Sequence, residues 1–158
     1  MNYSSTDPNG ILRTDAAVNY FNEGFNCSQS VALAFCDLFD TEPSVMLKIA
    51  SSFGGGFGRM REICGACSGM AIIIGLATGT DDPKDRTQKS NNYAVVQKAL
   101  SLFEKENGSY ICKKLLGLDK AEGSPIAEER TPEYYKKRPC AELVRSAATI
   151  LDTILKEI

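Results

Sequence analysis

The six cysteines are the residues of this chain whose chemistry is most informative. Two of them, Cys64 and Cys67, form a CxxC pair. We expect this pair to open a helix, where unpaired N–H groups and the positive end of the helix dipole favour thiolate over thiol. The chain has no histidine, which excludes Cys-His catalysis and imidazole metal ligands. The sequence therefore predicts chemistry at sulfur.

Four cysteines fall at or near the start of predicted helices, and positive side chains flank three of them. The four are Cys27, Cys64, Cys112 and Cys140, and the flanking cations are Arg59, Arg61, Lys113, Lys114 and the run Lys136-Lys137-Arg138. Helix N-termini and neighbouring cations both lower the pKa of a thiol. We therefore expect lowered pKa values at all four sulfurs, and we expect the four to gather around Cys64. Cys36 should face different neighbours from Cys27, because half a helical turn separates their directions.

A glycine-rich loop precedes the CxxC pair, and small residues follow it. The loop glycines are Gly54, Gly55, Gly56 and Gly58, with Arg59 directly after them. Backbone N–H groups of such a loop can cradle an anion, although this loop matches neither the P-loop nor the GxGxxG pattern. The preferred interpretation is that the loop passes closely over the cysteine site. Gly65 and Gly69 leave room on the following helix for another backbone or a cofactor.

Apolar side chains recur at helical spacing and no segment alternates with period two, so the sequence predicts an all-α fold. We expect one domain over residues 1–158, a compact bundle of about six to seven helices after a loose lead-in over residues 1–10. The helices should cover 14–23, 27–39, a segment starting at Pro43, 64–76, 80–106, a short segment at Cys112, and a last helix from Cys140.

Several finer features are also predicted. The third helix should bury Val45, Met46, Ile49 and Ala50, and the last helix should bury Leu143, Val144, Ala147, Leu151, Ile154 and Leu155. Residues 117–132 are charged and contain glycine and proline, which indicates a loop. The charges of Glu128-Glu129 and Lys136-Lys137-Arg138 are expected to be solvated. Tyr134 and Tyr135 either shield the site or pack on the core.

Composition and charge exclude several classes of protein. The net charge is −2 and the pI is about 5.3, so no nucleic-acid-binding surface is indicated. The polar N-terminus has no signal-peptide core, and no apolar run is long enough to span a bilayer. We therefore expect a cytoplasmic protein, in which six cysteines indicate redox or metal chemistry before structural disulfides.

The cysteine pattern resembles the redox-active family named C_GCAxxG_C_C. Cys64-Gly65-Ala66-Cys67-Ser68-Gly69 fits the central CGAxxG, while Cys27, Cys112 and Cys140 fit the single flanking cysteines. Cys67 occupies a variable position of the motif and Cys36 lies outside it. The resemblance covers residues 17–155 and implies a small bacterial or archaeal protein of electron transfer, with an iron–sulfur cluster or another prosthetic group.

Three functions stay open at this point. In the first, which we prefer, Cys64 attacks a disulfide and Cys67 or a flanking cysteine resolves the mixed disulfide with a redox partner protein. In the second, Cys27, Cys64, Cys112 and Cys140 bind zinc or an iron–sulfur cluster. In the third, the glycine loop, Arg59 and Arg61 form a non-redox anion-binding module. Whether there is a cofactor at all, which protein is the partner, the oligomeric state and enzymatic turnover do not follow from the sequence.

Overall fold

The computed structural model describes residues 2–158, which contain eight α-helices and one 3₁₀-helix. They are α1 (Arg13–Asn22), α2 (Cys27–Leu33), η1 (Cys36–Phe39), α3 (Pro43–Ser51), α4 (Gly65–Thr78), α5 (Arg86–Asn107), α6 (Cys112–Leu115), α7 (Pro132–Lys137) and α8 (Cys140–Glu157). The β pairing of these residues is limited to two isolated bridges. The all-α prediction is therefore confirmed. None of the helices in residues 2–158 is long and apolar enough to cross a membrane.

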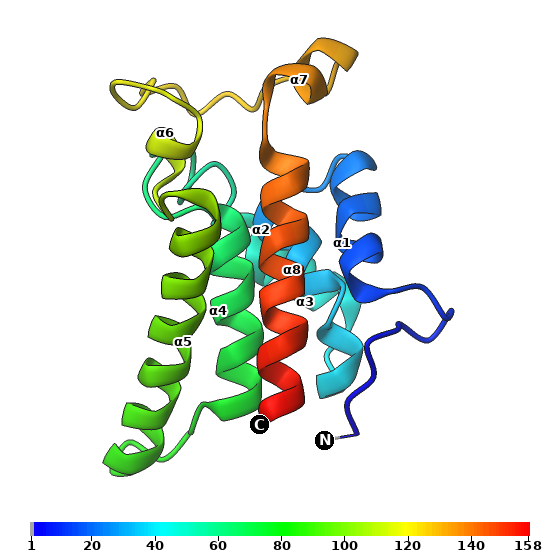
Figure 1. The fold of residues 1–158 in the computed structure, drawn as a ribbon, viewed down its shortest axis with the longest axis vertical. Coiled ribbons are helices and arrows are strands. Elements are labelled where there is room, and N and C mark those ends of the chain that lie inside the picture. Colours follow the sequence, from blue (N-terminus) through cyan, green and yellow to red (C-terminus); the bar gives the residue numbers. More distant parts are fainter. Residues whose placement is uncertain (1) are drawn as a thin grey trace.

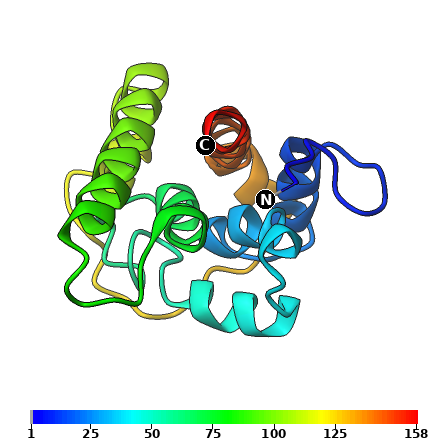
Figure 2. The same cartoon turned by 90° about the horizontal axis from the view of Figure 1, so that it is seen from below.

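The last helix carries the largest share of the hydrophobic core. All six of its predicted core residues are buried: Leu143, Val144, Ala147, Leu151, Ile154 and Leu155. α8 packs against α1, α2, α4 and α5, as the view along the bundle shows (Figure 2). Its stripe of apolar side chains repeats every three or four residues, so one face of the helix is removed from water.

α2 and α4 approach each other closely because α4 presents small residues. A Cβ atom added at Gly69 would lie 2.8 Å from the Ser28 carbonyl oxygen and 2.9 Å from the Val31 Cβ. Real Cβ atoms do not tolerate such distances, so the backbone of α2 occupies the space that a side chain would need. The small residues of α4 therefore allow α2 to pack closely against it.

The segment predicted as one helix over 27–39 is divided into α2 and η1. Arg13 is fully buried, and its guanidinium donates to the Ala34 carbonyl oxygen at 2.7 Å and to Asp37 at 2.6 Å. The Leu38 N–H instead bonds the Phe35 carbonyl at 3.2 Å, in the 3₁₀ pattern. A distant arginine thus replaces the bond that would have continued the α-helix.

α3 begins at Pro43 as predicted, but it buries only part of the predicted face. Met46 and Ala50 are buried, whereas Val45 and Ile49 are about half exposed. α3 packs against α2, α4 and η1. These neighbours lie along one narrow side, so the apolar residues next to that side remain in contact with solvent.

α5 begins at Arg86, later than the predicted start at Thr80. The Asp85 side chain accepts the Gln88 N–H at 2.8 Å and is the N-cap, while Asp82 accepts the Lys84 N–H in a preceding turn. Asp82 therefore lies in a turn before the helix, whereas the sequence analysis placed it in the first turn of a helix over 80–106. α7, which was not predicted, begins at Pro132 with Thr131 as its N-cap.

Candidate functional site

The four helix-start cysteines gather at one end of the bundle. Cys27, Cys112 and Cys140 are the first residues of α2, α6 and α8, and Cys64 is the N-cap of α4. α4 and α8 both begin at the end of the molecule that also carries α6 and α7 (Figure 1). The four cysteines line one cavity of about 60 Å³. The structure thus brings together the four residues that the sequence analysis singled out.

An isolated antiparallel bridge sets Cys64 beside Cys112. Ile63 pairs with Ile111, the Cys64 N–H donates to the Tyr110 carbonyl at 2.8 Å, and the Cys112 N–H donates to the Glu62 carbonyl at 2.6 Å. Each cysteine follows a bridge residue, so both side chains leave the bridge on the same face. A single β-bridge therefore fixes two of the four sulfurs relative to each other.

Asn26 anchors Cys27 at the start of α2. Its side chain accepts the Gln29 N–H at 2.9 Å and donates to the Ser51 carbonyl at 2.9 Å, and Gln29 completes the capping box. A Cβ atom at Gly65 would lie 3.2 Å from the Cys27 Cβ. Cys27 packs against Gly65, the first residue of α4. Because Gly65 has no side chain, the starts of α2 and α4 lie close together.

The CxxC pair gives one thiolate-favoured sulfur and one protonated thiol. The pKa of Cys64 is lowered by a hydrogen bond from the Cys67 thiol, with further stabilisation from the backbone N–H groups of Ala66 and Cys67. Burial raises the pKa of Cys67, as does its contact with Cys64. Cys67 lies in the core behind Cys64 and does not line the cavity. It is therefore a proton donor to Cys64 within the first helical turn.

A second pair of the same kind crosses between α2 and α8. The pKa of Cys140 is lowered by a hydrogen bond from the Cys27 thiol, and the guanidinium groups of Arg138, Arg130 and Arg61 lower it further. The pKa of Cys27 is raised by that same contact with Cys140 and by burial. Two sulfurs of the cavity thus favour the thiolate, and each has a neighbouring thiol that donates to it.

Cys112 departs from the predicted thiolate character. Burial raises the pKa of Cys112 to about 11, although the Arg61 guanidinium at 3.9 Å from its sulfur acts in the opposite direction. The prediction that all four pKa values are lowered is therefore wrong for Cys112 and Cys27. Adjacency in sequence to Lys113 and Lys114 does not lower the pKa of Cys112 enough to offset its removal from water.

The glycine loop passes over the cysteines in an unusual backbone conformation. Residues 55–59 are five consecutive residues with φ between 58° and 71°, and Arg61 follows with φ 59°. A Cβ at Gly56 would lie 2.6 Å from the Cys112 Cβ. The predicted close passage over the cysteine site is therefore observed at Gly56. Phe57, Arg59 and Arg61 adopt the left-handed region without being glycine, a strain that folded chains concentrate at functional sites.

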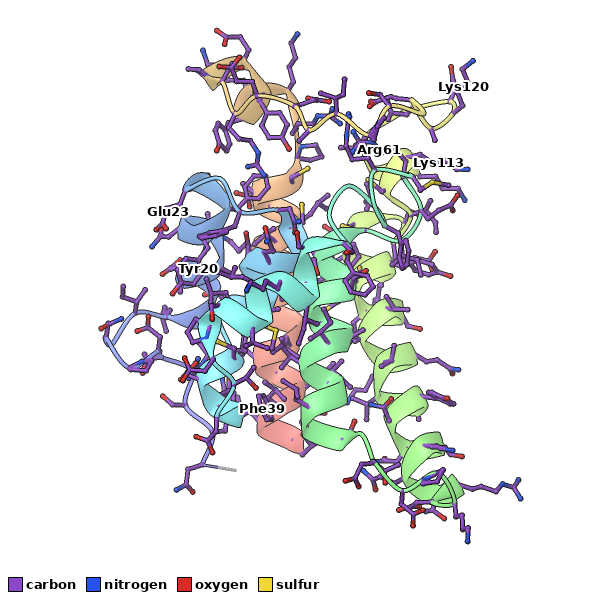
Figure 3. All side chains as sticks on the ribbon, turned by 180° about the vertical axis from the view of Figure 1, so that it is seen from behind. Tyr20, Glu23, Phe39, Arg61, Lys113 and Lys120 are labelled. Atoms are coloured by element: carbon purple, nitrogen blue, oxygen red, sulfur yellow. The ribbon has the colours of Figure 1, made fainter. Side chains whose placement is uncertain are left out.

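A larger pocket of about 340 Å³ adjoins the cysteine cavity. It lies between the glycine loop and the segment 118–131, which we call the strap. Four arginines line this pocket. Arg61, Arg130 and Arg138 also line the cysteine cavity, whereas Arg59 lines the pocket alone. Figure 3 shows Arg61 and the strap residue Lys120 at the same end of the molecule.

Ion pairs hold the strap over the site. Glu122 contacts Arg59 at 2.8 Å and Arg61 at 3.1 Å, and Glu128 contacts Arg59 at 3.4 Å and also pairs with Arg138. Glu128 and Arg138 are therefore paired with each other, which corrects the prediction that their charges are solvated. A signal was present in the sequence, because the predicted loop carries acidic residues whose charge is opposite to that of the arginines near the cysteines.

The sequence analysis did not name Arg130 at the site, and it considered Tyr134 only as one of two tyrosines that could shield it. Arg130 lies over the Tyr134 ring at 4.8 Å and over the Phe21 ring at 4.4 Å, and it donates to the Phe25 carbonyl at 3.0 Å. Tyr134 lines both the cavity and the pocket, whereas Tyr135 packs edge-on against Phe21. Of the two shielding residues considered, Tyr134 is the one at the site.

Cys36 lies outside the site, as expected. It is buried in η1, where burial and the nearby Asp37 raise its pKa. All six cysteines are free thiols in the structure. Although four of them line one cavity, no three His, Cys, Asp or Glu side chains within residues 2–158 are arranged to hold a metal ion. The donor types suit zinc or an iron–sulfur cluster, but the arrangement of the sulfurs does not form a ligand set.

Comparison with protein families gives one match. The family described as "Putative redox-active protein (C_GCAxxG_C_C)" matches residues 25–154, which include all six cysteines. The comparisons with curated proteins and with solved structures each gave no match. Residues 64–69 read CGAxxG where the printed family description has GCAxxG, so the order of the first cysteine and glycine differs between the two.

Proposed function

We propose, since the chain belongs to the family described as "Putative redox-active protein (C_GCAxxG_C_C)", that its redox chemistry is thiol–disulfide exchange at the four-cysteine cavity. One observation carries the proposal. Four cysteines line one cavity, and two of them, Cys64 and Cys140, each have a second cysteine beside them, Cys67 or Cys27, that lowers their pKa. Thiolate and neighbouring thiol are the two groups that disulfide exchange needs.

The chemical step is the same for either pair. The thiolate attacks one sulfur of an external disulfide, the sulfur–sulfur bond of that disulfide breaks, and one external thiolate leaves. The second protein thiol then attacks the mixed disulfide, and the other external thiolate leaves. The proton of the second protein thiol passes to one of the leaving thiolates, and the other leaving thiolate takes a proton from water. The protein loses two electrons and gains one disulfide, while the external disulfide is reduced to two thiols.

The residues around the two pairs fit this division of roles. Cys64 and Cys140 line the cavity, so a substrate sulfur that enters the cavity can reach them. Cys67 lies behind Cys64 in the core, and Cys27 shares the cavity with Cys140. Burial raises the pKa of Cys67, and contact with Cys140 together with burial raises the pKa of Cys27, so neither adds a second thiolate that would repel the first.

A four-thiolate metal or cluster site is the second candidate, because Cys27, Cys64, Cys112 and Cys140 line one cavity. Binding would require the sulfurs to move into a ligand set, and both Cys27 and Cys112 would have to lose protons that their surroundings retain. We therefore rank it below exchange.

One experiment separates the two candidates. The protein is purified without oxygen, its visible spectrum and metal content are recorded, and its thiols are counted before and after treatment with a disulfide oxidant. Exchange predicts a colourless, metal-free protein that reversibly loses two or four thiols, with mass spectrometry locating the disulfides at Cys64–Cys67 and Cys27–Cys140. Cys36→Ala is the matched control and should oxidise like the unmodified protein. Colour with four thiols protected from alkylation would support the metal site instead, and inert thiols would contradict both.

A further inference from the structure

We infer that the arginine-lined pocket next to the cysteine cavity binds the carboxylate of an acidic small-molecule disulfide and directs its sulfur atoms to the cysteines. This inference rests on the proposed function, whose substrate class it names. The pocket has about 340 Å³, which lies within the range of sites for small ligands. It opens beside the cavity of the four thiols, with Arg61, Arg130 and Arg138 lining both.

The charge of the pocket is opposite to that of the whole chain. The chain has a net charge of −2, yet four arginines line the pocket with only Glu128 as a lining carboxylate in the described part of the chain, and Glu122 pairs with Arg59 and Arg61 from outside the lining. Arg130 forms no ion pair within 4.0 Å among residues 2–158, because its guanidinium donates to backbone carbonyls of Phe21 and Phe25. Positive charge therefore remains available to an anion, and guanidinium groups suit the two oxygens of a carboxylate.

A buried donor without a partner also indicates a missing ligand group. The Arg61 side chain is 7% exposed, and its Nε–H is buried and has no hydrogen-bond partner. Native structures rarely leave such a donor unpaired, because the cost of its desolvation is not recovered. Arg61 sits between the two spaces and contacts the Cys112 sulfur at 3.9 Å. An oxygen of a bound carboxylate is the kind of acceptor that this N–H lacks.

The strap shows where a carboxylate fits. Glu128 places its carboxylate against Arg59 at 3.4 Å and Arg61 at 3.8 Å, and it also pairs with Arg138. An internal side chain thus occupies the position that a substrate carboxylate would take, and the two compete for the same guanidinium groups. Removing the Glu128 charge should therefore strengthen the preference for acidic substrates, a result that a purely structural ion pair would not give.

The test compares three disulfides as oxidants of the reduced full-length protein at neutral pH and low salt: dithiodiglycolate, which is a dianion, hydroxyethyl disulfide, which is neutral, and cystamine, which is a dication. For each disulfide we compare second-order rate constants, and we take the rate constant for the anionic disulfide divided by that for the neutral one. This ratio is then divided by the ratio measured with free mercaptoethanol, which corrects for the intrinsic reactivity of the two disulfides. In each reaction the disulfide is reduced to two thiols and two protein thiols become a disulfide. We expect a ratio of roughly ten, and a cationic disulfide slower than the neutral one.

Variants locate the effect. Arg59→Gln, which lies outside the cysteine cavity, should lower the ratio roughly threefold, and Glu128→Gln should raise it by about the same factor. Arg145→Gln and Glu157→Gln remove the same charges elsewhere and should leave the ratio within about twofold. Using a ratio cancels any change in access to the thiols when the strap is altered. A ratio near one, or pocket variants that behave like these controls, would overturn the inference while leaving the exchange function intact.

A binding measurement keeps the inference independent of the exchange chemistry. Thiodiglycolate is the unreactive thioether dicarboxylate, and thiodiglycol is its neutral counterpart. Calorimetric titration should show binding of the dicarboxylate alone, weakened in Arg59→Gln and strengthened in Glu128→Gln. If no disulfide oxidises the protein but this pattern holds, the proposed function fails and the anion pocket stands. If the dicarboxylate does not bind, the pocket assignment fails whatever the thiols do.

Discussion

In a chain without histidine, the pKa of a cysteine falls below its ordinary value only where other groups stabilise the thiolate charge. At Cys64 these groups are the Cys67 thiol and first-turn backbone N–H groups, and at Cys140 they are the Cys27 thiol and nearby guanidiniums. Cys112 lines the same cavity, and burial dominates there despite its contact with Arg61. The direction of the pKa shift therefore depends on which donors face each sulfur and not on burial alone.

Cys140 and Cys112 offer a matched comparison of this effect, because both are 8% exposed and line the same cavity. As pH rises, Cys140 should become reactive below the ordinary thiol pKa, whereas Cys112 should react only as pH approaches its pKa of about 11. Isotope-coded alkylation of the reduced protein, read by mass spectrometry at each cysteine, measures both midpoints. Equal midpoints for the two thiols would contradict the roles given to Cys27 and the arginines.

The sequence identified the four cavity cysteines but not the differences among them. Their positions follow from local signals, such as Asn26 as an N-cap before Cys27 and the small residues after Cys64. The pKa differences depend on contacts between distant segments, such as Cys27 with Cys140 on α8. Adjacent lysines in the sequence gave the wrong sign for Cys112, because neighbours along the chain are not necessarily the groups that face the sulfur.

Among the helices, the close packing of α2 on α4 fixes the distance between two of the cysteine-bearing helix starts. Gly65 meets the Cys27 Cβ and Gly69 meets Ser28, so glycines one turn apart let the two backbones approach. Both glycines were expected to admit a backbone or a cofactor; Gly69 meets the α2 backbone, and Gly65 meets both α2 and the Phe53 carbonyl oxygen. What the sequence did not predict was the division of α2 from η1, because that depends on Arg13, which reaches Ala34 from another helix.

Two glycines of α4 allow a direct test of this packing. Gly69→Ala should destabilise the protein by about 1–3 kcal/mol, because the new methyl group would lie 2.8 Å from the Ser28 carbonyl oxygen. Gly75→Ala on the same helix meets nothing within 4 Å and should be neutral or stabilising by up to about 1 kcal/mol. Urea unfolding followed by circular dichroism measures both. If the two variants have the same free energy of unfolding, the close α2–α4 contact is not significant for stability.

Across the whole molecule, chemistry and stability are assigned to different parts. The core formed by α8 with α1, α2, α4 and α5 occupies the body of the bundle, while the four cysteines, the glycine loop and the strap lie at one end (Figure 1). The strap contains no helix and is held by ion pairs of Glu122 and Glu128. The sequence indicated this loop correctly, but it could not indicate its position, because the arginines that hold it come from two other segments.

The strap should open when salt weakens these ion pairs. Raising salt from about 0.05 M to about 1 M shortens the screening length to a few ångströms, which weakens attraction between partly exposed charges such as Arg59 and Glu122. Hydrogen exchange of the amides in residues 118–131 should therefore become several-fold faster, while the buried amides of α8 keep their rates. In the double variant Glu122→Gln and Glu128→Gln, strap exchange should already be fast at low salt and respond little to added salt. Unchanged strap exchange in the unmodified protein, or an equal salt response in the double variant, would mean that packing of residues such as Arg130 on Phe21 holds the strap instead.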